Sequence, residues 1–529
     1  MKKITSLIVA TTLLLNLNAA DPNWVRIWEN SATLNGSSPA YIGTTNNVRG
    51  MGVGTFEGTK VVVVPTREGG TAVKLLKASD GTEWKSLNVT GISGGLFAVS
   101  DAGVTNDGKI LVSNMVNAAS NVFKVYRWDN STDAPTVAIS YTLPAAHRIG
   151  DHITIKGSTV DGTAKVYAFS TALVSTKASI FRFDMISDGN GGYVFDSNPV
   201  VISNLIAATG GYNSLDIFPD GKYIYKYNGS QMIKLNADGS IPAPAETSSS
   251  SIVATGGNSV RYLLSRPAVN VGEPDTAYVA YYRYGSGQER ANVVKFPNST
   301  LNAAGTAIAS YLPVLGTNSN TNGAGRVAID EVSANSVNIY VLSSNNGIGK
   351  YLVTWVPTAA TITTATPSEI PPGDRSLSVE FTAPSTSGGK AISNYKYSLD
   401  GGATYTAFSP AQTTSPLVIS GLSVNSTYNV KVKAINENGD GFESNNMEVV
   451  LLYSGVTAEN NRKLNIEFLS SSIRVTGSDV SSITLLNTVG QQVRTVEGVN
   501  EIATNGLKGV YLLRINSAGK VVRNSKIIL

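Results

Sequence analysis

The residues best suited to metal or acid–base chemistry are few in this sequence. Its only two histidines, His147 and His152, flank Arg148 and Asp151. Two imidazoles and a carboxylate resemble part of a metal site, but a complete site would need another ligand-bearing segment. In an extended chain the i,i+5 spacing places the two rings on opposite faces. We therefore expect core or surface roles for both histidines, although one ring could still point into a site.

Other catalytic patterns are weak. The sequence contains no cysteine, and Gly285-Ser286-Gly287 is expected in a hairpin loop, not at the strand-to-helix turn of a nucleophile elbow. Asp184, Asp188 and Asn190 offer oxygen ligands for calcium, but they lack the alternate spacing and terminal Glu of an EF-hand loop. A plain turn is the favoured interpretation, with calcium as the alternative. We predict no catalytic residue, no metal site and no cofactor.

A second set of polar residues recurs at intervals along residues 21–357. Each member lies next to the start of a short apolar segment, and the set comprises Arg49, Arg148, Asp151, Tyr212, Asn213, Asn258, Arg261 and Arg326. What these residues can do depends on how the apolar segments assemble.

The apolar segments occur as six successive pairs of strands, which is typical of the blades of a propeller. The pairs are 60–66 with 72–79, 109–115 with 121–129, 165–171 with 178–185, 223–229 with 231–238, 276–284 with 291–298, and 338–344 with 349–355. Turns such as Asp107-Gly108 and Asp220-Gly221 introduce several of them, because glycine tolerates the positive φ of a tight turn. We predict a six-bladed β-propeller over residues 21–357, with seven blades or an irregular sandwich array as alternatives. The isolated strand 24–29 would complete the last blade.

A shorter innermost strand is expected ahead of most pairs, for example at 49–54, 153–155, 214–218, 260–264 and 326–329. In a propeller these strands surround the axis, so the recurring polar residues would line one mouth of the channel, where ligands commonly bind. Arginines at equivalent positions could form a ring that recognises carboxylates, such as those of uronic acids, by bidentate contacts. In the competing interpretation they pair with Asp or Glu and close the channel.

Composition agrees with an exported all-β chain. Glycine is abundant (51 residues), charged residues make up only 15%, and no segment of 12 or more residues beyond the first 20 has a clear helical period. The net charge of +4 comes entirely from residue 456 onward, where nine Lys/Arg oppose five Asp/Glu. Because the rest of the chain is balanced, a nucleic-acid partner is not expected.

Residues 359–453 show period-two alternation over 377–381, 392–399, 417–419, 428–436 and 447–452. Gly389-Lys390-Ala391-Ile392-Ser393-Asn394-Tyr395, Gly421-Leu422 with Tyr428, and Ala434 to Gly439 resemble motifs of the fibronectin type III domain. The resemblance implies a β-sandwich in which the Tyr428 phenol bonds back to the chain, with Val379 or Phe381 in place of the usual tryptophan. The threonine-rich run 358–367 is expected to be a linker. A spacer role is favoured for this domain, with ligand binding as the alternative.

The two ends of the sequence indicate where the protein goes. Lys2 and Lys3 followed by the apolar run 4–17 and Ala19-Ala20 are typical of a signal peptide over residues 1–20, and no later apolar run is long enough to span a membrane. From Val456 to Leu529, short strands surround Asn487-Thr488-Val489-Gly490-Gln491 and Leu507-Lys508-Gly509-Val510-Tyr511. This stretch resembles the type A C-terminal sorting domain of the Bacteroidetes type IX secretion system, which implies that the secretion machinery is a partner and that the protein is secreted or held at the outer cell surface.

Two function classes remain open on the sequence. The first is a non-catalytic protein that binds or adheres to glycan or protein through the propeller, which also resembles uncharacterised propeller-like domains of secreted proteins. The second is a secreted polysaccharide lyase or hydrolase with its site at the propeller mouth. Glycoside hydrolysis needs two carboxylates roughly 5–10 Å apart, and no pair among the 37 acidic residues stands out.

Overall fold

A computed structural model describes residues 21–172, 178–205, 211–227, 230–249, 253, 256–266, 275–285, 287–297, 300–302, 305–370, 374–423, 426–451, 464–476, 480–517 and 520–529. The signal peptide expected at residues 1–20 and the start of the stretch from Val456 lie outside this part. Within the described residues the chain is all-β, as predicted, with one helical turn, α1 (Ala32–Asn35). No helix in the described part is long and apolar enough to cross a membrane.

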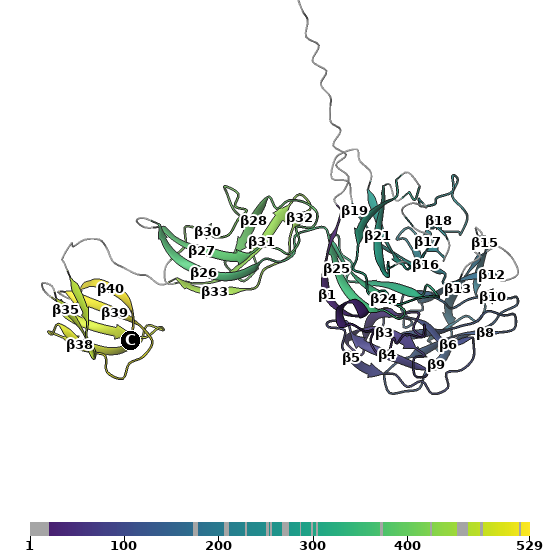
Figure 1. Ribbon diagram of the computed structural model, residues 1–529, viewed down its shortest axis with the longest axis horizontal. Coiled ribbons are helices and arrows are strands. Elements are labelled where there is room, and N and C mark those ends of the chain that lie inside the picture. Colours follow the sequence, from purple (N-terminus) through teal and green to yellow (C-terminus); the bar gives the residue numbers. More distant parts are fainter. Residues whose placement is uncertain are drawn as a thin grey trace, which may run out of the picture.

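The first and largest part of the chain is a six-bladed propeller of antiparallel sheets (Figure 1). Blade 1 consists of β2 (Gly52–Phe56), β3 (Thr59–Thr66), β4 (Ala72–Lys77) and β5 (Glu83–Ser86). Blade 2 consists of β6 (Phe97–Val104), β7 (Ile110–Met115), β8 (Val122–Trp128) and β9 (Thr136–Thr142). Blade 3 consists of β10 (His147–Arg148), β11 (Ile153–Lys156), β12 (Lys165–Ala172), β13 (Ala178–Ser187), β14 (Tyr193–Phe195) and β15 (Val200–Leu205). Blade 4 consists of β16 (Ser214–Ile217), β17 (Tyr223–Lys226) and β18 (Ile233–Leu235). Blade 5 consists of β19 (Gly257–Arg266), β20 (Thr276–Arg283), β21 (Arg290–Pro297) and β22 (Ala307–Tyr311). Blade 6 consists of β23 (Gly325–Asp330), β24 (Ser336–Ser343), β25 (Gly347–Thr354) and β1 (Asn23–Ser31).

The ring closes through the N-terminal strand. β1 pairs antiparallel with β25, from Asn23 opposite Thr354 to Ser31 opposite Gly347, which confirms the prediction that this strand completes the last blade. Each interface between neighbouring blades contains its own buried apolar cluster, six clusters in all. The innermost strands β2, β6, β11, β16, β19 and β23 also contact one another in turn, with β23 meeting β2. Burial between blades thus holds six inner strands around one axis.

All six predicted hairpins are present. The innermost strand of blade 2, β6, was not among the predicted inner strands. Its sequence from Phe97 to Val104 includes Ser100, Asp101 and Gly103, so it lacks the alternation expected of a strand that faces a core. Asp101 is accommodated in this strand because its carboxylate is buried in an ion pair with Arg326 of blade 6.

The fibronectin type III domain follows the propeller in the chain and forms two sheets. One contains β26 (Thr361–Ile370), β27 (Asp374–Thr382) and β30 (Leu417–Ile419); the other contains β28 (Asn394–Ser398), β29 (Thr406–Ala407), β31 (Ser426–Asn436), β32 (Gly439–Asp440) and β33 (Met447–Leu451). The Tyr428 hydroxyl donates to the carbonyl of Ser423 at 3.1 Å and accepts its N–H at 2.8 Å, the predicted tyrosine corner. Val379 and Phe381 are both buried in the core.

The prediction that 358–367 is a linker was wrong. Most of this run belongs to β26, which pairs along β27, and Ile362 is buried between the sheets. Threonine is β-branched and favours strands, so the polar composition of the run concealed an edge strand. The fibronectin type III domain also contacts the propeller directly. Asn438 Nδ2 donates a hydrogen bond to the carbonyl of Trp355 at 2.7 Å, and the Phe442 N–H donates one to the carbonyl of Pro357 at 3.0 Å.

The C-terminal stretch is a small pair of sheets. Its strands are β34 (Asn465–Phe468), β35 (Ser472–Thr476) and β38 (Glu501–Ala503) in one sheet, and β36 (Val480–Leu486), β37 (Gln492–Glu497), β39 (Val510–Ser517) and β40 (Lys520–Ile528) in the other. Ile473, Leu485 and Leu513 are fully buried between them. The fold is therefore a small sandwich, as predicted.

Candidate functional site

The site is built on the innermost strands, which all run in the same direction along the axis. We call the end where they begin the entry mouth and the end where they finish the exit mouth. Because β3 is antiparallel to β2, Arg67, just beyond the end of β3, also lies at the entry mouth. Segments from blades 1 to 4 therefore meet there, although they are far apart in the sequence.

Three arginines and two aromatic rings alternate at the entry mouth, and we call them the arginine–aromatic ladder. The Arg67 guanidinium lies 3.8 Å from the centre of the Phe97 ring, and Arg49 lies 4.5 Å from the same ring. Arg49 is also 4.3 Å from the Tyr212 ring, and Arg148 is 5.2 Å from it. Cation–π contacts of this kind stabilise a desolvated guanidinium by about 0.5–2 kcal/mol each.

Asp151 is the carboxylate that holds the ladder together. It accepts hydrogen bonds from Arg148 Nε at 2.6 Å and Nη2 at 2.8 Å, and from Arg49 Nη2 at 3.3 Å. Oδ2, which accepts from Arg148 Nε, also accepts the backbone N–H of Tyr212 at 3.2 Å. Burial by itself would raise the pKa of Asp151, but Arg148 and Arg49 hold it below its usual value. Asp151 is therefore ionised at neutral pH.

The backbone beside the ladder is fitted to it. Tyr212 has φ +62°, a left-handed conformation that is uncommon for a non-glycine residue. A Cβ on the preceding Gly211 would lie only 2.9 Å from Arg148 Nε. Strained backbone of this kind is concentrated at functional sites, and here it brings a tyrosine ring between two arginines.

The ladder carries an excess of positive charge. Two of its three guanidinium groups pair with one carboxylate, Asp151, and the third, that of Arg67, makes no ion pair with any described residue. The Nε of Arg67 is buried and has no hydrogen-bond partner in the described part of the chain. Burial, together with the nearby Arg49, lowers the pKa of Arg67 to about 10, so the side chain remains protonated at pH 7. A partly exposed cation without a counter-ion can bind an anionic group from outside.

Below the ladder, an ion pair blocks the axis. Arg326 Nη2 lies 2.8 Å from Asp101 Oδ2, and both side chains are almost completely buried. The backbone of Ile153 completes the contact: its N–H donates to Asp101 at 2.7 Å and its carbonyl accepts from Arg326 at 2.6 Å. This group, which we call the central plug, separates the two mouths.

The plug and the adjacent His152 contain buried polar atoms without a hydrogen-bond partner among the described residues. They are Arg326 Nε and Nη1, Asp101 Oδ1 and both ring nitrogens of His152. Burial and the neighbouring Arg326 and Arg261 hold the pKa of His152 well below its usual value, so the ring is neutral. Burial, with Arg261 nearby, also lowers the pKa of Arg326 to about 9. Groups of this kind are normally satisfied by ordered water, which fits a polar propeller axis.

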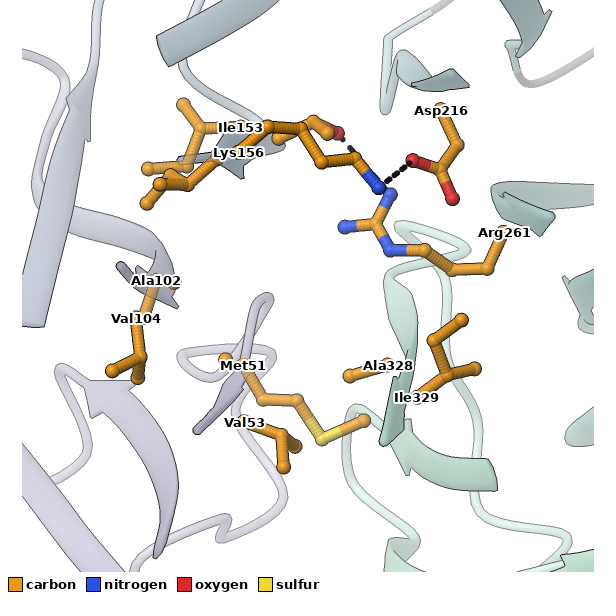
Figure 2. A pocket seen from close by; sticks show the side chains of 14 residues that line it. Met51, Val53, Ala102, Val104, Ile153, Lys156, Asp216, Arg261, Ala328 and Ile329 are labelled. Carbon is orange, nitrogen blue, oxygen red and sulfur yellow. Dashed lines mark hydrogen bonds and ion pairs between the residues drawn. The ribbon is translucent and has the colours of Figure 1, made fainter. Parts of the chain in front are cut away.

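A cavity of about 130 Å³ lies at the exit mouth, and the inner strands of all six blades line it (Figure 2). Lys156 Nζ forms an ion pair with Asp216 Oδ1 at 3.1 Å across one wall, and the Arg261 guanidinium lies beside them. Arg261 Nη1 donates to Thr154 Oγ1 at 3.2 Å and to the carbonyls of Leu215 and Val260 at 3.1 Å.

The structure divides the residues predicted from the sequence into four groups. Arg49, Arg148, Asp151 and Tyr212 meet at the entry mouth, Arg326 is part of the plug, and Arg261 lies at the exit mouth. Asn213 and Asn258 are buried, and their amide groups hydrogen-bond to Thr171 Oγ1 and to the carbonyl of Gly323. The arginines therefore do not form one ring at one mouth, and all except Arg261 pair with aspartates along the axis.

Several residues of the site were not predicted. Arg67 and Phe97 complete the ladder, Asp101 completes the plug, and Lys156 and Asp216 line the exit cavity. Arg67 could have been found from the sequence. In an antiparallel pair the end of the second strand, here β3, lies beside the start of the first strand, here β2.

The other candidates for metal chemistry have structural partners. His147 Nδ1 lies 3.1 Å from Ser170 Oγ, and its ring packs edge-on against Phe181. Asp188 Oδ1 accepts the N–H groups of Asn190 and Gly192, which makes the loop a turn closed by its own carboxylate. Among the described residues no group of three or more His, Cys, Asp or Glu is arranged to hold a metal ion.

Comparisons with known proteins give two family matches. Residues 8–282 match the model of a domain of unknown function, DUF4623, and residues 365–450 match the fibronectin type III domain. No curated protein matches the chain.

Solved structures with a similar fold include a DUF4623 family protein from Bacteroides eggerthii, with 15% identity, a TM-score of 0.46, and 64% of this chain and 76% of that chain covered. They also include a subtype N11 neuraminidase-like protein of an influenza virus from a flat-faced bat, with 12% identity, a TM-score of 0.37, and 64% and 95% covered. An endo-arabinase from Bacteroides thetaiotaomicron has 10% identity, a TM-score of 0.31, and 60% and 96% covered.

Proposed function

The chain belongs to the DUF4623 family, and we propose that it is a secreted or cell-surface protein that binds an acidic glycan or protein at the entry mouth of its propeller, without catalysis. The observation that carries this proposal is the charge balance of the arginine–aromatic ladder. Only two of its three guanidinium groups pair with a carboxylate, Asp151, and the third, that of Arg67, has no anionic partner among the described residues. A ligand carboxylate or sulfate would supply the missing charge.

The axial aspartates favour binding over hydrolysis. A glycosidase needs two carboxylates on either side of the scissile bond, one of them able to donate a proton. Asp101 and Asp151 are fully buried and paired with arginines, and Asp216 is buried and paired with Lys156. None of the three is free to contact a sugar without first losing its ion pair.

The competing function is a secreted polysaccharide lyase or hydrolase with its site at the propeller mouth. One observation favours it: burial raises the pKa of Asp101, as a general acid requires. Reducing-end release from pectin, alginate and arabinan by the mature chain, abolished by Asp101→Asn in a correctly folded variant, would establish the enzyme. Activity that survives this substitution would come from a contaminating enzyme.

The proposed export route rests on both ends of the sequence. In the C-terminal sandwich, Asn487 Oδ1 accepts the N–H groups of Val489 and Gln491 to form a tight turn, and Gly490 has φ +81°. Gly509 has φ +110° and exchanges both backbone hydrogen bonds with Leu529. The motif residues therefore have definite structural roles in a folded module, which supports a sorting domain. In a type IX-secreting host, deletion of residues 456–529 should retain the protein inside the cell envelope; undiminished export would refute the assignment.

The binding proposal is tested with the mature chain, residues 21–529, on an array of neutral, uronic-acid and sulfated glycans and, in parallel, on acidic proteins. We expect binding to acidic members that weakens as salt rises. Arg67→Gln should lower the affinity at least about tenfold, since a charge-assisted hydrogen bond contributes about 1.5–3 kcal/mol. Arg127→Gln is the matched control, because Arg127 pairs with the exposed Asp129 away from the axis. Equal binding by the two variants, or a preference for neutral glycans, would contradict the proposal.

A further inference from the structure

The exit-mouth cavity is separate from the entry mouth, and its walls have two different characters. Its polar wall is formed by Lys156, Asp216 and Arg261, which come from the consecutive blades 3, 4 and 5. The opposite wall comes from blades 6, 1 and 2 and is apolar: Met51, Val53, Ala102, Val104, Ala328 and Ile329. Figure 2 shows the Arg261 guanidinium reaching from its strand into the cavity, beside Lys156 and Asp216. The cavity therefore suits a molecule with one charged end and one hydrocarbon end.

The hydrogen bonds of the polar wall leave donors available. All three bonds of Arg261 to described residues are made by Nη1, so Nε and Nη2 have no protein acceptor there. These two nitrogens form one edge of the guanidinium fork, which matches the two oxygens of a carboxylate. Neither nitrogen is among the fully buried atoms that lack a partner, which means that both are exposed to the cavity.

The carboxylate on this wall is already engaged. Asp216 Oδ1 pairs with Lys156, and Oδ2 accepts the Tyr262 N–H at 3.0 Å. Lys156 and Arg261 together exceed Asp216 by one positive charge. The side chain of Lys156 is 50% exposed, so the cavity is in contact with solvent. An incoming anion would balance the excess charge without displacing the existing ion pair.

We propose that this cavity binds a small aliphatic carboxylate. The acid group would accept hydrogen bonds from Arg261 Nε and Nη2 near Lys156, and the hydrocarbon would lie against Val53, Val104 and Ile329. The size agrees, because a cavity of about 150 Å³ holds one benzene molecule. Such a ligand would bind independently of the entry mouth, since the Arg326–Asp101 pair lies between the two.

The test uses the mature chain and three probes of the same shape: isobutyrate, isobutyramide and isobutanol. Titration followed by ligand-observed NMR should show saturable binding of isobutyrate, with the amide and the alcohol at least about tenfold weaker. Arg261→Gln should weaken isobutyrate at least about tenfold, because a bidentate charged contact is lost. Ile329→Phe should abolish binding by filling the cavity from its apolar side, and Arg67→Gln should leave the affinity unchanged.

Three outcomes would overturn the proposal: equal binding of acid and amide, no saturable binding of isobutyrate, or unchanged affinity in Ile329→Phe. If Arg261→Gln does not fold, Lys156→Gln serves instead, because Lys156 is half exposed and its loss removes the excess charge while leaving the Arg261 bonds intact. Unchanged isobutyrate affinity in Lys156→Gln would also count against the proposal. A failure of isobutyrate to bind leaves the entry-mouth function unaffected, since that function is tested by Arg67→Gln.

Discussion

The ion pair of the central plug gives the sharpest prediction for stability. Arg326 and Asp101 are 1% and 0% exposed and lie 2.8 Å apart, and Asp101 also accepts the Ile153 N–H. Asp101→Asn keeps the shape and one acceptor but leaves the Arg326 charge buried without a carboxylate. Removing one partner of a buried ion pair typically costs 3–5 kcal/mol. We therefore expect the propeller of this variant to lose about 3–5 kcal/mol of unfolding free energy at pH 7.

The measurement can be confined to the propeller. All five tryptophans lie between residues 24 and 355, so tryptophan fluorescence during urea unfolding reports this domain and not the two sandwiches. Lys74→Gln is the control, because Lys74 and Glu83 form a partly exposed pair at 2.6 Å that should contribute less than about 1 kcal/mol.

The reverse substitution should behave differently with pH. In Arg326→Met the buried Asp101 remains, and burial raises the pKa of this carboxyl group. A carboxyl group whose pKa is raised by folding binds its proton more tightly in the folded protein than in the unfolded chain. Its contribution to the unfolding free energy is therefore complete below the pKa it has in the unfolded chain and is lost as pH rises through its folded-state pKa. Arg326→Met should therefore recover part of its lost stability, relative to the unsubstituted protein, between pH 7 and pH 4.

The double variant Asp101→Leu/Arg326→Met separates charge from packing. Replacing both partners with apolar residues is often neutral or stabilising, so the double variant should be more stable than either single variant. Our reasoning would be refuted if Asp101→Asn cost no more than Lys74→Gln, or if the double variant lost the sum of the two single losses.

Three further predictions concern the turns and interfaces of the propeller. Asp107 accepts hydrogen bonds from the N–H and the hydroxyl of Thr159, and these bonds lower its pKa to about 2 although burial opposes them. After allowance for solvent screening, Asp107→Ala should lower the unfolding free energy by about 1 kcal/mol near pH 7. In pH-dependent unfolding, the difference in stability between this variant and the unsubstituted protein should disappear as pH falls from 4 through 2. Trp28→Ala should lower the unfolding free energy by about 3–5 kcal/mol, because Trp28 is buried and donates from the closing strand to a backbone carbonyl of blade 1; a calorimetric shift no larger than that of Trp28→Phe would contradict this role. Gly325→Ala should cost at least about 1–3 kcal/mol in urea unfolding, since the added Cβ would lie 2.2 Å from the Tyr282 ring, and a loss below 0.5 kcal/mol would show that the ring can move.

Most of the propeller could be predicted because its signals are local. A hairpin such as β3–β4 consists of two alternating segments joined by a turn, and both features are visible within about 20 residues of sequence. The closing strand was also recognisable, since a strand without its own hairpin must pair elsewhere. The predictions failed where the local pattern was misleading: the run that forms β26 is polar, and β6 includes Asp101 within an inner strand.

The site was only half predictable. The sequence shows that Arg49, Arg148 and Arg326 precede or begin inner strands, so their approach to the axis follows from the fold. It does not show that Arg49 pairs with Asp151 while Arg326 pairs with Asp101. These choices depend on the height of each residue along the axis, which is set by strand register and by the bulges within the blades.

Strand alternation and turn residues act over short distances, so the amino-acid sequence was enough to predict an all-β chain with six hairpin units, a fibronectin type III domain and a third small module. Which charged side chains are neutralised and which remain available for a ligand became visible only in the folded propeller. Asp101 and Arg326 are 225 positions apart in the sequence and in contact on the axis, whereas Arg67 lies at the mouth and pairs with no carboxylate of the described residues. The state of a charged group depends on its burial and its nearest opposite charge, and both are set only when the ring of blades closes.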